Sequence, residues 1–293
     1  MARIEARLPD NAPGEFFVDD TCIDCATCRQ VAPGVFVPSH GLTVVGRQPA
    51  GEVERQRSLM ALVACPTASI GTVGRTDARA AVRRFPEEVA EGVYYCGFAS
   101  PHSYGASSYL IRRAQGNVLV DSPRAAGPLL DAIERLGGVR HMFLTHRDDV
   151  ADHAAIHRRF GCERILHERD VTPETAGVER HLEGDEPVAL GGGLIAIPAP
   201  GHTPGSAVLS YRDAFLFTGD HLMGREDGSG LYASRSVCWY SWPEQTRSME
   251  RLLEYSFEWV LPGHGARYRA ASPEAMRVEL RRAIADMRSR RDR

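Results

Sequence analysis

The sequence predicts an α+β protein in two parts, a small cysteine-rich module followed by a larger domain of layered strands and helices. Residues 1 to about 74 are dense in Cys, Gly and Pro and contain only short strand-like runs, whereas the chain after about residue 90 alternates longer apolar runs with amphipathic segments. The charged stretch between them carries Pro86, as an exposed linker does. We therefore expect a first domain at residues 1–74, a linker at 75–90 and a second domain at 91–293.

Periodicity in the second part predicts strands and helices that alternate along the chain. Two strand-like runs, SSYLIRR and NVLVD, are expected to form a hairpin, and a helix is expected from Gly127 to Leu136. A buried strand at HMFLT follows, and then a helix near Ala154–Phe160. Further along we expect strands at LIAIPA, AVLSYR and AFLFTG, a helix around Gln245–Tyr255, a strand at EWVL and a terminal helix. Mixed strands with helices between them indicate a layered α/β domain, in preference to a sandwich of sheets alone.

Composition and charge exclude several classes of partner. The chain has 293 residues, 43% of them hydrophobic and 25% charged, so it is long enough for more than one hydrophobic core. The formal net charge of −3 disfavours nucleic acid and anionic membrane surfaces. No stretch approaches the roughly 20 apolar residues of a membrane span, and the start, MARIEARLPD, lacks the apolar core of a signal peptide. We expect a cytoplasmic protein without a membrane partner.

Four cysteines are spaced as metal ligands. Cys22, Cys25 and Cys28 form a CxxCxxC run, and Cys65 stands before Pro66. Thiolates are soft, charged donors that bind iron well, and three of them in one loop can hold one face of a cubane cluster. The segment resembles bacterial ferredoxins, whose signature in each half is CxxCxxCxxxCP. The resemblance implies one [4Fe-4S] cluster held by these four cysteines in the first quarter of the chain.

The segment departs from the ferredoxin pattern at Ala32, which stands where the first run would have its fourth cysteine. The second half keeps only the late Cys-Pro pair, so we expect one cluster and not two. A structural zinc site and a disulfide remain as alternatives, although four-cysteine zinc sites usually bring their ligands in two CxxC pairs. The other cysteines, Cys96, Cys162 and Cys238, have no ligand spacing and are expected to be buried small apolar residues.

Histidine and aspartate residues recur in four segments, each after an expected strand or within a glycine-rich turn. The first is HRDDVADH, from His146 to His153, and the others are GHTPG around His202, TGDH around Asp220 and PGHG around His264. Imidazoles and carboxylates together bind borderline divalent metals, and a bridging carboxylate holds two ions near each other. Two such ions polarise a substrate oxygen and lower the pKa of a bound water.

The order of these segments resembles the metallo-β-lactamase superfamily, whose motifs are HxHxDH, a His in GHTPG, a bridging Asp and a late His in PGHG. The resemblance implies an αββα metallo-β-lactamase sandwich after the small ferredoxin-like α+β domain, with two divalent metal ions, iron or zinc. Asp152 and Asp220 become the expected catalytic carboxylates. The ligands that it implies are His146 and His202 for one metal, Asp152, His153 and His264 for the other, and Asp220 as the bridge.

One position departs from this motif. Asp148 stands where the usual motif has its second histidine, and two extra residues separate it from Asp152 and His153. We expect Asp148 to be a metal ligand, with Asp149 as the alternative. Flavodiiron proteins share the metallo-β-lactamase fold and have a carboxylate at this position, in HxExDH, around a di-iron centre, so the sequence resembles that variant. Carboxylate-rich sites favour iron over zinc as a tendency.

Two enzymatic functions follow from this resemblance. The first is an oxidoreductase in which the ferredoxin-like domain passes electrons to a dinuclear, di-iron site and takes them from a donor such as a reductase. The second is a metal-dependent hydrolase of an ester, thioester, amide or lactone, in which the cluster is structural or regulatory. The cluster and Asp148 both favour redox chemistry, so we rank it slightly ahead of hydrolysis.

Either enzyme would act on a small-molecule substrate, and a homodimer is compatible with both. A regulatory binding module on the same scaffold is disfavoured because the ligand set is nearly complete. The sequence leaves the substrate, the metal and the oligomeric state open.

Overall fold

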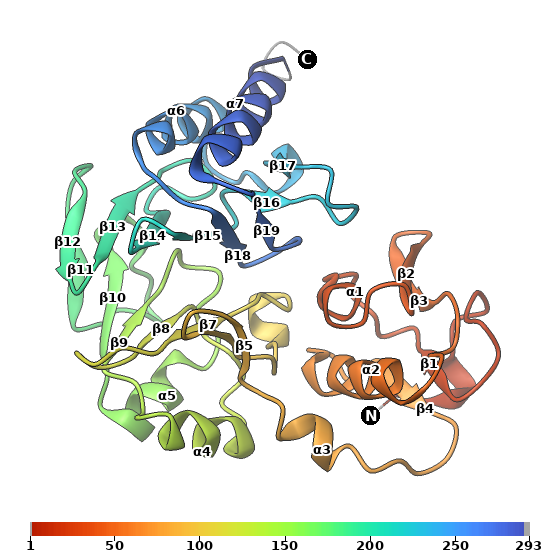
Figure 1. Cartoon of the computed structure of the whole chain (residues 1–293). Helices are drawn as coiled ribbons and strands as arrows, with labels where there is room; N and C mark the ends of the chain where they lie inside the picture. The colour runs from red at the N-terminus through yellow and green to blue at the C-terminus, as the bar shows by residue number, and fades with distance from the viewer. Residues whose placement is uncertain (1, 290–293) are drawn as a thin grey trace. The chain divides into compact units, whose positions relative to one another are not determined.

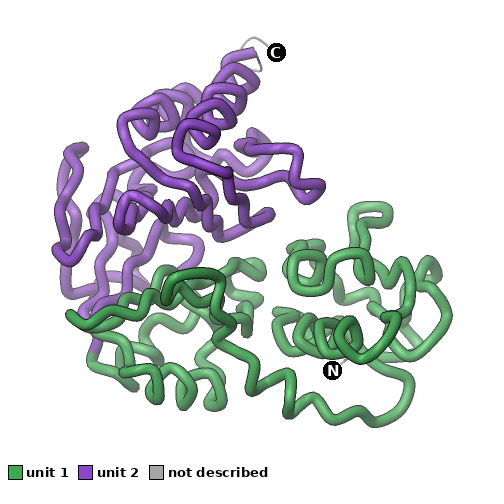
Figure 2. The backbone as a smooth tube through the Cα atoms, viewed as in Figure 1, with its two compact units in different colours: residues 1–140, 151–161 green, residues 141–150, 162–293 purple. Residues whose placement is uncertain are grey.

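The computed structural model describes residues 2–289, and the chain divides into two compact units (Figures 1 and 2). The first unit comprises residues 1–140 and 151–161, and the second comprises residues 141–150 and 162–293. The HRDDVADH segment is therefore shared between the units, with its first five residues in the second unit and its last three in the first. Within the described range, no helix is both long and apolar enough to cross a membrane.

The first unit begins with a small α+β module that is red to orange in Figure 1. The side chain of Asn11 is buried at its centre, where Oδ1 accepts the backbone N–H groups of Val18 (3.0 Å) and Val45 (2.9 Å) and so links two ribbons. Its elements are the antiparallel ribbons β1 (Phe16–Val18) with β4 (Ile70–Thr72) and β2 (Phe36–Ser39) with β3 (Leu42–Val45), and the helices α1 (Thr27–Val31) and α2 (Glu52–Ala64).

The rest of the first unit is an antiparallel meander with helices. The expected hairpin is confirmed, since Tyr109 pairs with Val120 across β7 and β8, and all six residues of the two strands are buried. The side chain of Asn117 donates to the carbonyls of Leu136 (3.0 Å) and Gly138 (2.8 Å), which caps the end of α4. The elements are α3 (Arg79–Val82), β5 (Glu87–Ala90), β6 (Val93–Tyr95), β7 (Tyr109–Ile111), β8 (Val118–Val120), α4 (Gly127–Arg135) and α5 (His153–Phe160).

The second unit contains three parallel strands, β9 (His141–Phe143), β10 (Glu163–His167) and β11 (Arg180–Leu182). The carboxyl ends of parallel strands meet at one edge of a sheet, which is where loops commonly carry functional side chains. The loop after β9 carries His146, and the loop after β10 carries Asp170. Both side chains are buried.

A six-stranded sheet forms the larger part of the second unit. Its neighbours are antiparallel except for β15 and β18, which run parallel. A separate two-stranded ribbon is made by β16 (Met223–Gly224) and β17 (Leu231–Tyr232). The order of the large sheet is β12 (Val188–Gly191), β13 (Leu194–Pro198), β14 (Ala207–Tyr211), β15 (Phe215–Gly219), β18 (Trp259–Pro262) and β19 (Tyr268–Arg269).

Two helices contribute most of the remaining core of this unit, α6 (Trp242–Arg251) and α7 (Pro273–Ser289), which lie side by side (Figure 1, blue). Their apolar side chains pack in one cluster with those of β13 to β18. The helix expected around Gln245–Tyr255 begins three residues earlier, because the Ser241 hydroxyl accepts the N–H of Glu244 (3.3 Å) and Pro243 follows. It ends at Arg251, where a 3-10 turn takes over.

Candidate metal centres

The four predicted cluster ligands line one cavity in the first unit. Cys22 and Cys25 lie in the loop before α1, Cys28 lies within α1, and Cys65 directly follows α2. Asp24 and Ala26 have positive φ values of 54° and 62°. These left-handed conformations turn the chain sharply, so that the two loop cysteines and Cys28 reach the same cavity. The backbone N–H of Ser69 donates to Sγ of Cys65 (3.3 Å). None of the seven cysteines, all of which lie in the described range, forms a disulfide.

The chemistry of these thiols fits an iron–sulfur cluster. Burial raises the pKa of Cys25 to about 11 and raises the pKa of Cys28 well above its ordinary value, and neighbouring thiols add to both shifts. Thiolates are therefore disfavoured in this cavity unless a cationic metal core compensates their charge. Four thiols that line one cavity, two of which have raised pKa values, match the donor set of a cubane cluster.

The three remaining cysteines follow the expectation only in part. Cys96 and Cys162 are buried, as expected of small apolar residues. Cys238 is half-buried, which corrects the expectation for that residue. It directly follows the 3-10 turn Arg235–Val237, where its thiol donates to the carbonyl of Gly201 (3.2 Å) and its side chain packs against the hydrophobic cluster of the second unit. The hydrogen bond ties this segment to the turn that precedes His202.

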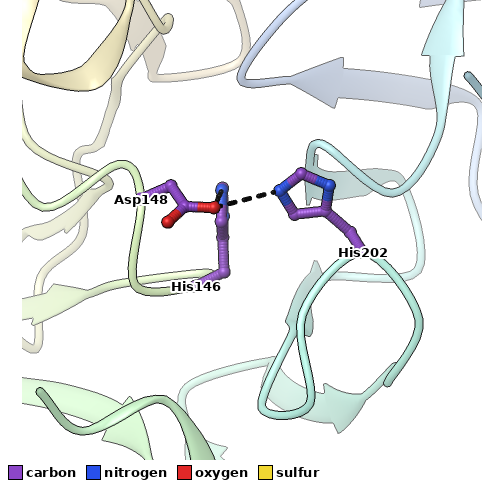
Figure 3. Close-up of side chains that lie close together, drawn as sticks. All are labelled: His146, Asp148 and His202. Atoms are coloured by element: carbon purple, nitrogen blue, oxygen red, sulfur yellow. Dashed lines mark ion pairs between the residues drawn. The ribbon is translucent and has the colours of Figure 1, made fainter. Parts of the chain in front are cut away.

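Three predicted ligands converge at the edge of the second unit, as Figure 3 shows for His146, Asp148 and His202. The Thr145 hydroxyl lies 2.9 Å from Nδ1 of His146 and orients the ring so that Nε2 faces inward. The carbonyl of His202 accepts the N–H groups of Trp239 (3.0 Å) and Tyr240 (3.1 Å), which fixes the backbone of this turn. Nε2 of His146 and Nε2 of His202 are buried and have no hydrogen-bond partner within residues 2–289.

The spacing of these atoms fits a single ion. Oδ2 of Asp148 lies 3.4 Å from Nε2 of His202 and 4.0 Å from Nε2 of His146. Oδ2 of Asp220 lies 3.8 Å and 3.9 Å from the same two nitrogens. Four ligands placed about 2.1 Å from a tetrahedral ion are about 3.4 Å apart. Small side-chain movements would bring these four groups to that spacing around one ion, and Nε2 of each imidazole forms no hydrogen bond in the described chain that the ion would have to displace.

The structure brings both candidate aspartates to His146. Asp148 is exposed over almost half of its side chain, whereas Asp149 is buried, with Oδ2 4.0 Å from Nε2 of His146. The candidate ligand atoms form two groups, and Asp149 belongs to the one with His146 and Asp220. A Cβ atom at Gly263 would lie 2.6 Å from Oδ2 of Asp149, so the glycine of the PGHG motif makes room for that carboxylate. Both aspartates therefore stay candidates for the centre.

The remaining predicted ligands are placed separately. Nδ1 of His264 lies 2.7 Å and 3.0 Å from the two carboxylate oxygens of Asp220. Asp152 and His153 belong to the first unit, where Asp152 precedes α5 and accepts the N–H of Ala125 with Oδ2 (2.7 Å). Neither group of candidate ligand atoms includes Asp152, His153 or His264. Their role as ligands of a second metal stays a prediction.

Local electrostatics give the protonation states that metal binding requires. Burial lowers the pKa of His146 to about 4, against the opposing effect of Asp220. Burial by itself would raise the pKa of Asp220, but the nearby charge and hydrogen bond of His264 outweigh it and the net shift is downward. The imidazole is thus neutral and the carboxylate ionised at pH 7, as ligands of a divalent ion must be.

Asp170 is a supporting residue that the sequence analysis missed. Its side chain is fully buried and accepts three hydrogen bonds, from the N–H of Arg147 (3.0 Å), the hydroxyl of Thr203 (2.5 Å) and the N–H of Gly205 (2.7 Å). It therefore joins the loop of His146 to the turn of His202. In the sequence, Asp170 is marked only by its place three residues after a buried strand. Many aspartates without a structural role lie in such positions, so the sequence does not single it out.

Gly219 directly precedes Asp220 and has φ +49°, and a Cβ there would lie 2.4 Å from Oγ1 of Thr145 and 3.2 Å from Nδ1 of His146. We expect Gly219→Ala to displace the His146 ring and to weaken metal binding by about 10-fold to 100-fold, measured by competition with a chelator. Gly228→Ala is the matched control, because Gly228 has φ +73° with open space around it and shares only the backbone strain. Equal metal affinities in the two variants would contradict this account of Gly219.

Two family models match the chain. Residues 104–264 match the metallo-beta-lactamase superfamily, over more than half of the chain. The chain belongs to the metallo-β-lactamase superfamily. Residues 18–72 match the 4Fe-4S single cluster domain of Ferredoxin I, so the predicted combination of an N-terminal iron–sulfur domain with a metallo-β-lactamase domain is confirmed.

Parts of the chain are similar to proteins of other bacteria. An uncharacterized protein of Bacillus subtilis (strain 168), YobT, is 27% identical over an alignment of 219 residues. The alignment covers 62% of this chain and 92% of that protein. A hydroxyacylglutathione hydrolase of Anaeromyxobacter dehalogenans (strain 2CP-C) is 37% identical over 128 residues, 41% of this chain and 48% of that protein. The chain thus spans about half the length of this hydrolase.

A solved structure agrees on the fold. The crystal structure of the DIM-1 metallo-beta-lactamase superposes with a TM-score of 0.51 at 17% identity, covering 67% of this chain and 96% of that chain. The predicted fold class, a metallo-β-lactamase fold with a small N-terminal α+β domain, is confirmed.

Proposed function

We propose that this protein is a metal-dependent hydrolase of an ester, thioester, amide or lactone. The observation that carries the proposal is the convergence of two buried imidazole nitrogens that form no hydrogen bond in the described chain, Nε2 of His146 and Nε2 of His202, with the carboxylates of Asp148 and Asp220. Similarity to hydroxyacylglutathione hydrolases also favours hydrolysis. This support reverses the order of the two functions that the sequence suggested.

The residues of the chain divide the work of such a site. His146, His202 and Asp220, with Asp148 or Asp149, would hold one ion, and Asp152, His153 and His264 would hold a second that shares Asp220. When bound, divalent ions polarise the scissile carbonyl and lower the pKa of the attacking water. Asp220, ionised and in contact with His264, would be the shared carboxylate, and Asp152, at the start of α5, would be a ligand of the second ion.

Hydrolysis is tested with a panel of ester, thioester, amide and lactone substrates. We expect turnover of at least one class, loss of that turnover on treatment with a chelator, and its return when a divalent metal is added. A protein that binds its metals and turns over none of the four classes would contradict the proposal.

A second candidate function is an oxidoreductase in which the cluster passes electrons to a di-iron site. The observation that favours it is the carboxylate of Asp148, which lies 3.4 Å from Nε2 of His202, where the usual motif has an imidazole. Such an enzyme would need an electron donor such as a reductase. A homodimer would be compatible with either function.

Metal analysis of anaerobically purified protein separates the two functions. For the hydrolase we expect about four iron and about two zinc ions per chain, because imidazole and carboxylate ligands together suit zinc. About six iron per chain, with no zinc, would instead favour the oxidoreductase.

A further inference from the structure

A segment that follows the cysteine module runs along the cluster cavity within the first unit. The hydroxyl of Thr27 donates to the carbonyl of Gly105 (3.0 Å) and lies 3.4 Å from Sγ of Cys25. A Cβ at Gly105, which has φ +85°, would lie 2.6 Å from Cβ and 2.8 Å from Sγ of Cys25. The backbone of Gly105 therefore rests against a predicted cluster ligand, at a distance that only glycine allows.

The same segment also holds the end of α2, directly before Cys65. The N–H of Ala99 donates to the carbonyl of Ala64 (3.2 Å), and Nη2 of Arg124 donates to the carbonyl of Val63 (3.3 Å). These are carbonyls of the last helical turn, which have no partner inside the helix. The position of Cys65 is thereby linked to Arg124.

Arg124 connects this contact to Asp152. Its guanidinium lies over the ring of Phe98, 5.8 Å from the centroid, and its backbone N–H donates to the carbonyl of Phe98 (2.8 Å). The next residue, Ala125, donates its N–H to Oδ2 of Asp152 (2.7 Å). One continuous run of contacts within the first unit thus leads from the residue before a cluster ligand to a predicted ligand of the second metal.

We propose that Arg124 is a positioning residue through which cluster loading sets the affinity of the metal site at Asp152. A bound cluster fixes Cys65 and the last turn of α2, and this turn holds the Arg124 side chain. The backbone at Ala125 is then fixed. Oδ2 of Asp152 keeps its hydrogen bond from the N–H of Ala125, and the other carboxylate oxygen is left to bind an ion. This inference rests on the proposed role of Asp152 as a metal ligand.

The test is a thermodynamic cycle on the full chain. Cluster-loaded protein and protein stripped of iron by oxidation are compared for the affinity of the more weakly held Co²⁺ ion, by chelator competition and by its visible absorption spectrum. We expect removal of the cluster to lower the affinity of the wild type for this ion roughly tenfold. In Arg124→Ala we expect weak binding with or without the cluster.

Arg135→Ala is the matched control, because Arg135 is exposed on α4 in the same unit and lies outside this run of contacts. It should show the wild-type dependence on the cluster. Cys65→Ala provides a second route to cluster-free protein and should reproduce the affinity of the stripped wild type.

Three results would overturn the inference. These are an affinity that does not depend on the cluster in the wild type, a tenfold dependence that persists in Arg124→Ala, or an Asp152→Ala variant that keeps both ions at wild-type affinity. The assay reads metal binding and not turnover. If metal affinity depends on the cluster but the protein hydrolyses none of the substrates, the proposed function alone is refuted. If the protein is an active hydrolase whose metal affinity does not depend on the cluster, this inference alone is refuted.

Discussion

Substituting His202 with alanine is expected to release metal from the centre and to lower the hydrolytic rate by more than about 100-fold. The side chain is buried, and its Nε2 lies 3.4 Å from the carboxylate of Asp148 and 3.8 Å from that of Asp220. Alanine removes one of the nitrogen ligands and leaves the two carboxylates without it. The measurements are metal content after dialysis and the initial rate on the substrate found by the panel.

His181→Ala is the control for this substitution, because His181 is an exposed histidine on β11 of the same unit. It should keep its metal and its activity. If His202→Ala kept both as well, the metal centre proposed at this edge would be wrong.

Asp170→Ala is expected to reduce the free energy of unfolding by about 3 kcal/mol, because it removes the acceptor of three hydrogen bonds, two of them from buried groups. The three donors are the N–H of Arg147, the hydroxyl of Thr203 and the N–H of Gly205. For a unit of this size, the loss corresponds to a fall of about 6–12 °C in the midpoint of thermal unfolding. The variant should also bind metal more weakly, since Asp170 joins the loop of His146 to the turn of His202.

The comparison for Asp170 is Asp185→Ala. Asp185 forms an exposed ion pair with Arg169 (2.8 Å), and such pairs contribute at most about 1 kcal/mol. If Asp170→Ala and Asp185→Ala had the same midpoint of thermal unfolding, the three hydrogen bonds of Asp170 would not stabilise the fold.

The family and the fold class were predictable because they depend on local spacing. The CxxCxxC run places three thiols within seven residues, so these ligands stay close together however the rest of the chain folds. The order of the segments around His146, His202, Asp220 and His264 is equally a property of the chain. Strands such as HMFLT and AFLFTG were predictable because they are short apolar runs bounded by turn residues.

The supporting contacts could not be predicted, since each joins residues that are distant in sequence. Asp170 acts on residues 23 to 35 positions away, and Arg124 contacts a carbonyl 61 positions away. Nothing near either residue marks it in the sequence. The start of α6 was also misplaced, because a serine cap extended the helix beyond its apolar pattern.

The sequence by itself determined which atoms are available as ligands, four thiols and a set of imidazoles and carboxylates, because ligand chemistry belongs to the residue type. The tertiary structure alone decided which of them share a site. It brought both Asp148 and Asp149 to His146, left Nε2 of His146 and Nε2 of His202 buried without hydrogen bonds in the described chain, and set Gly105 against Cys25. The physical reason is that convergence to within a few ångströms depends on how loops from separate strands pack, and local spacing carries no information about that packing.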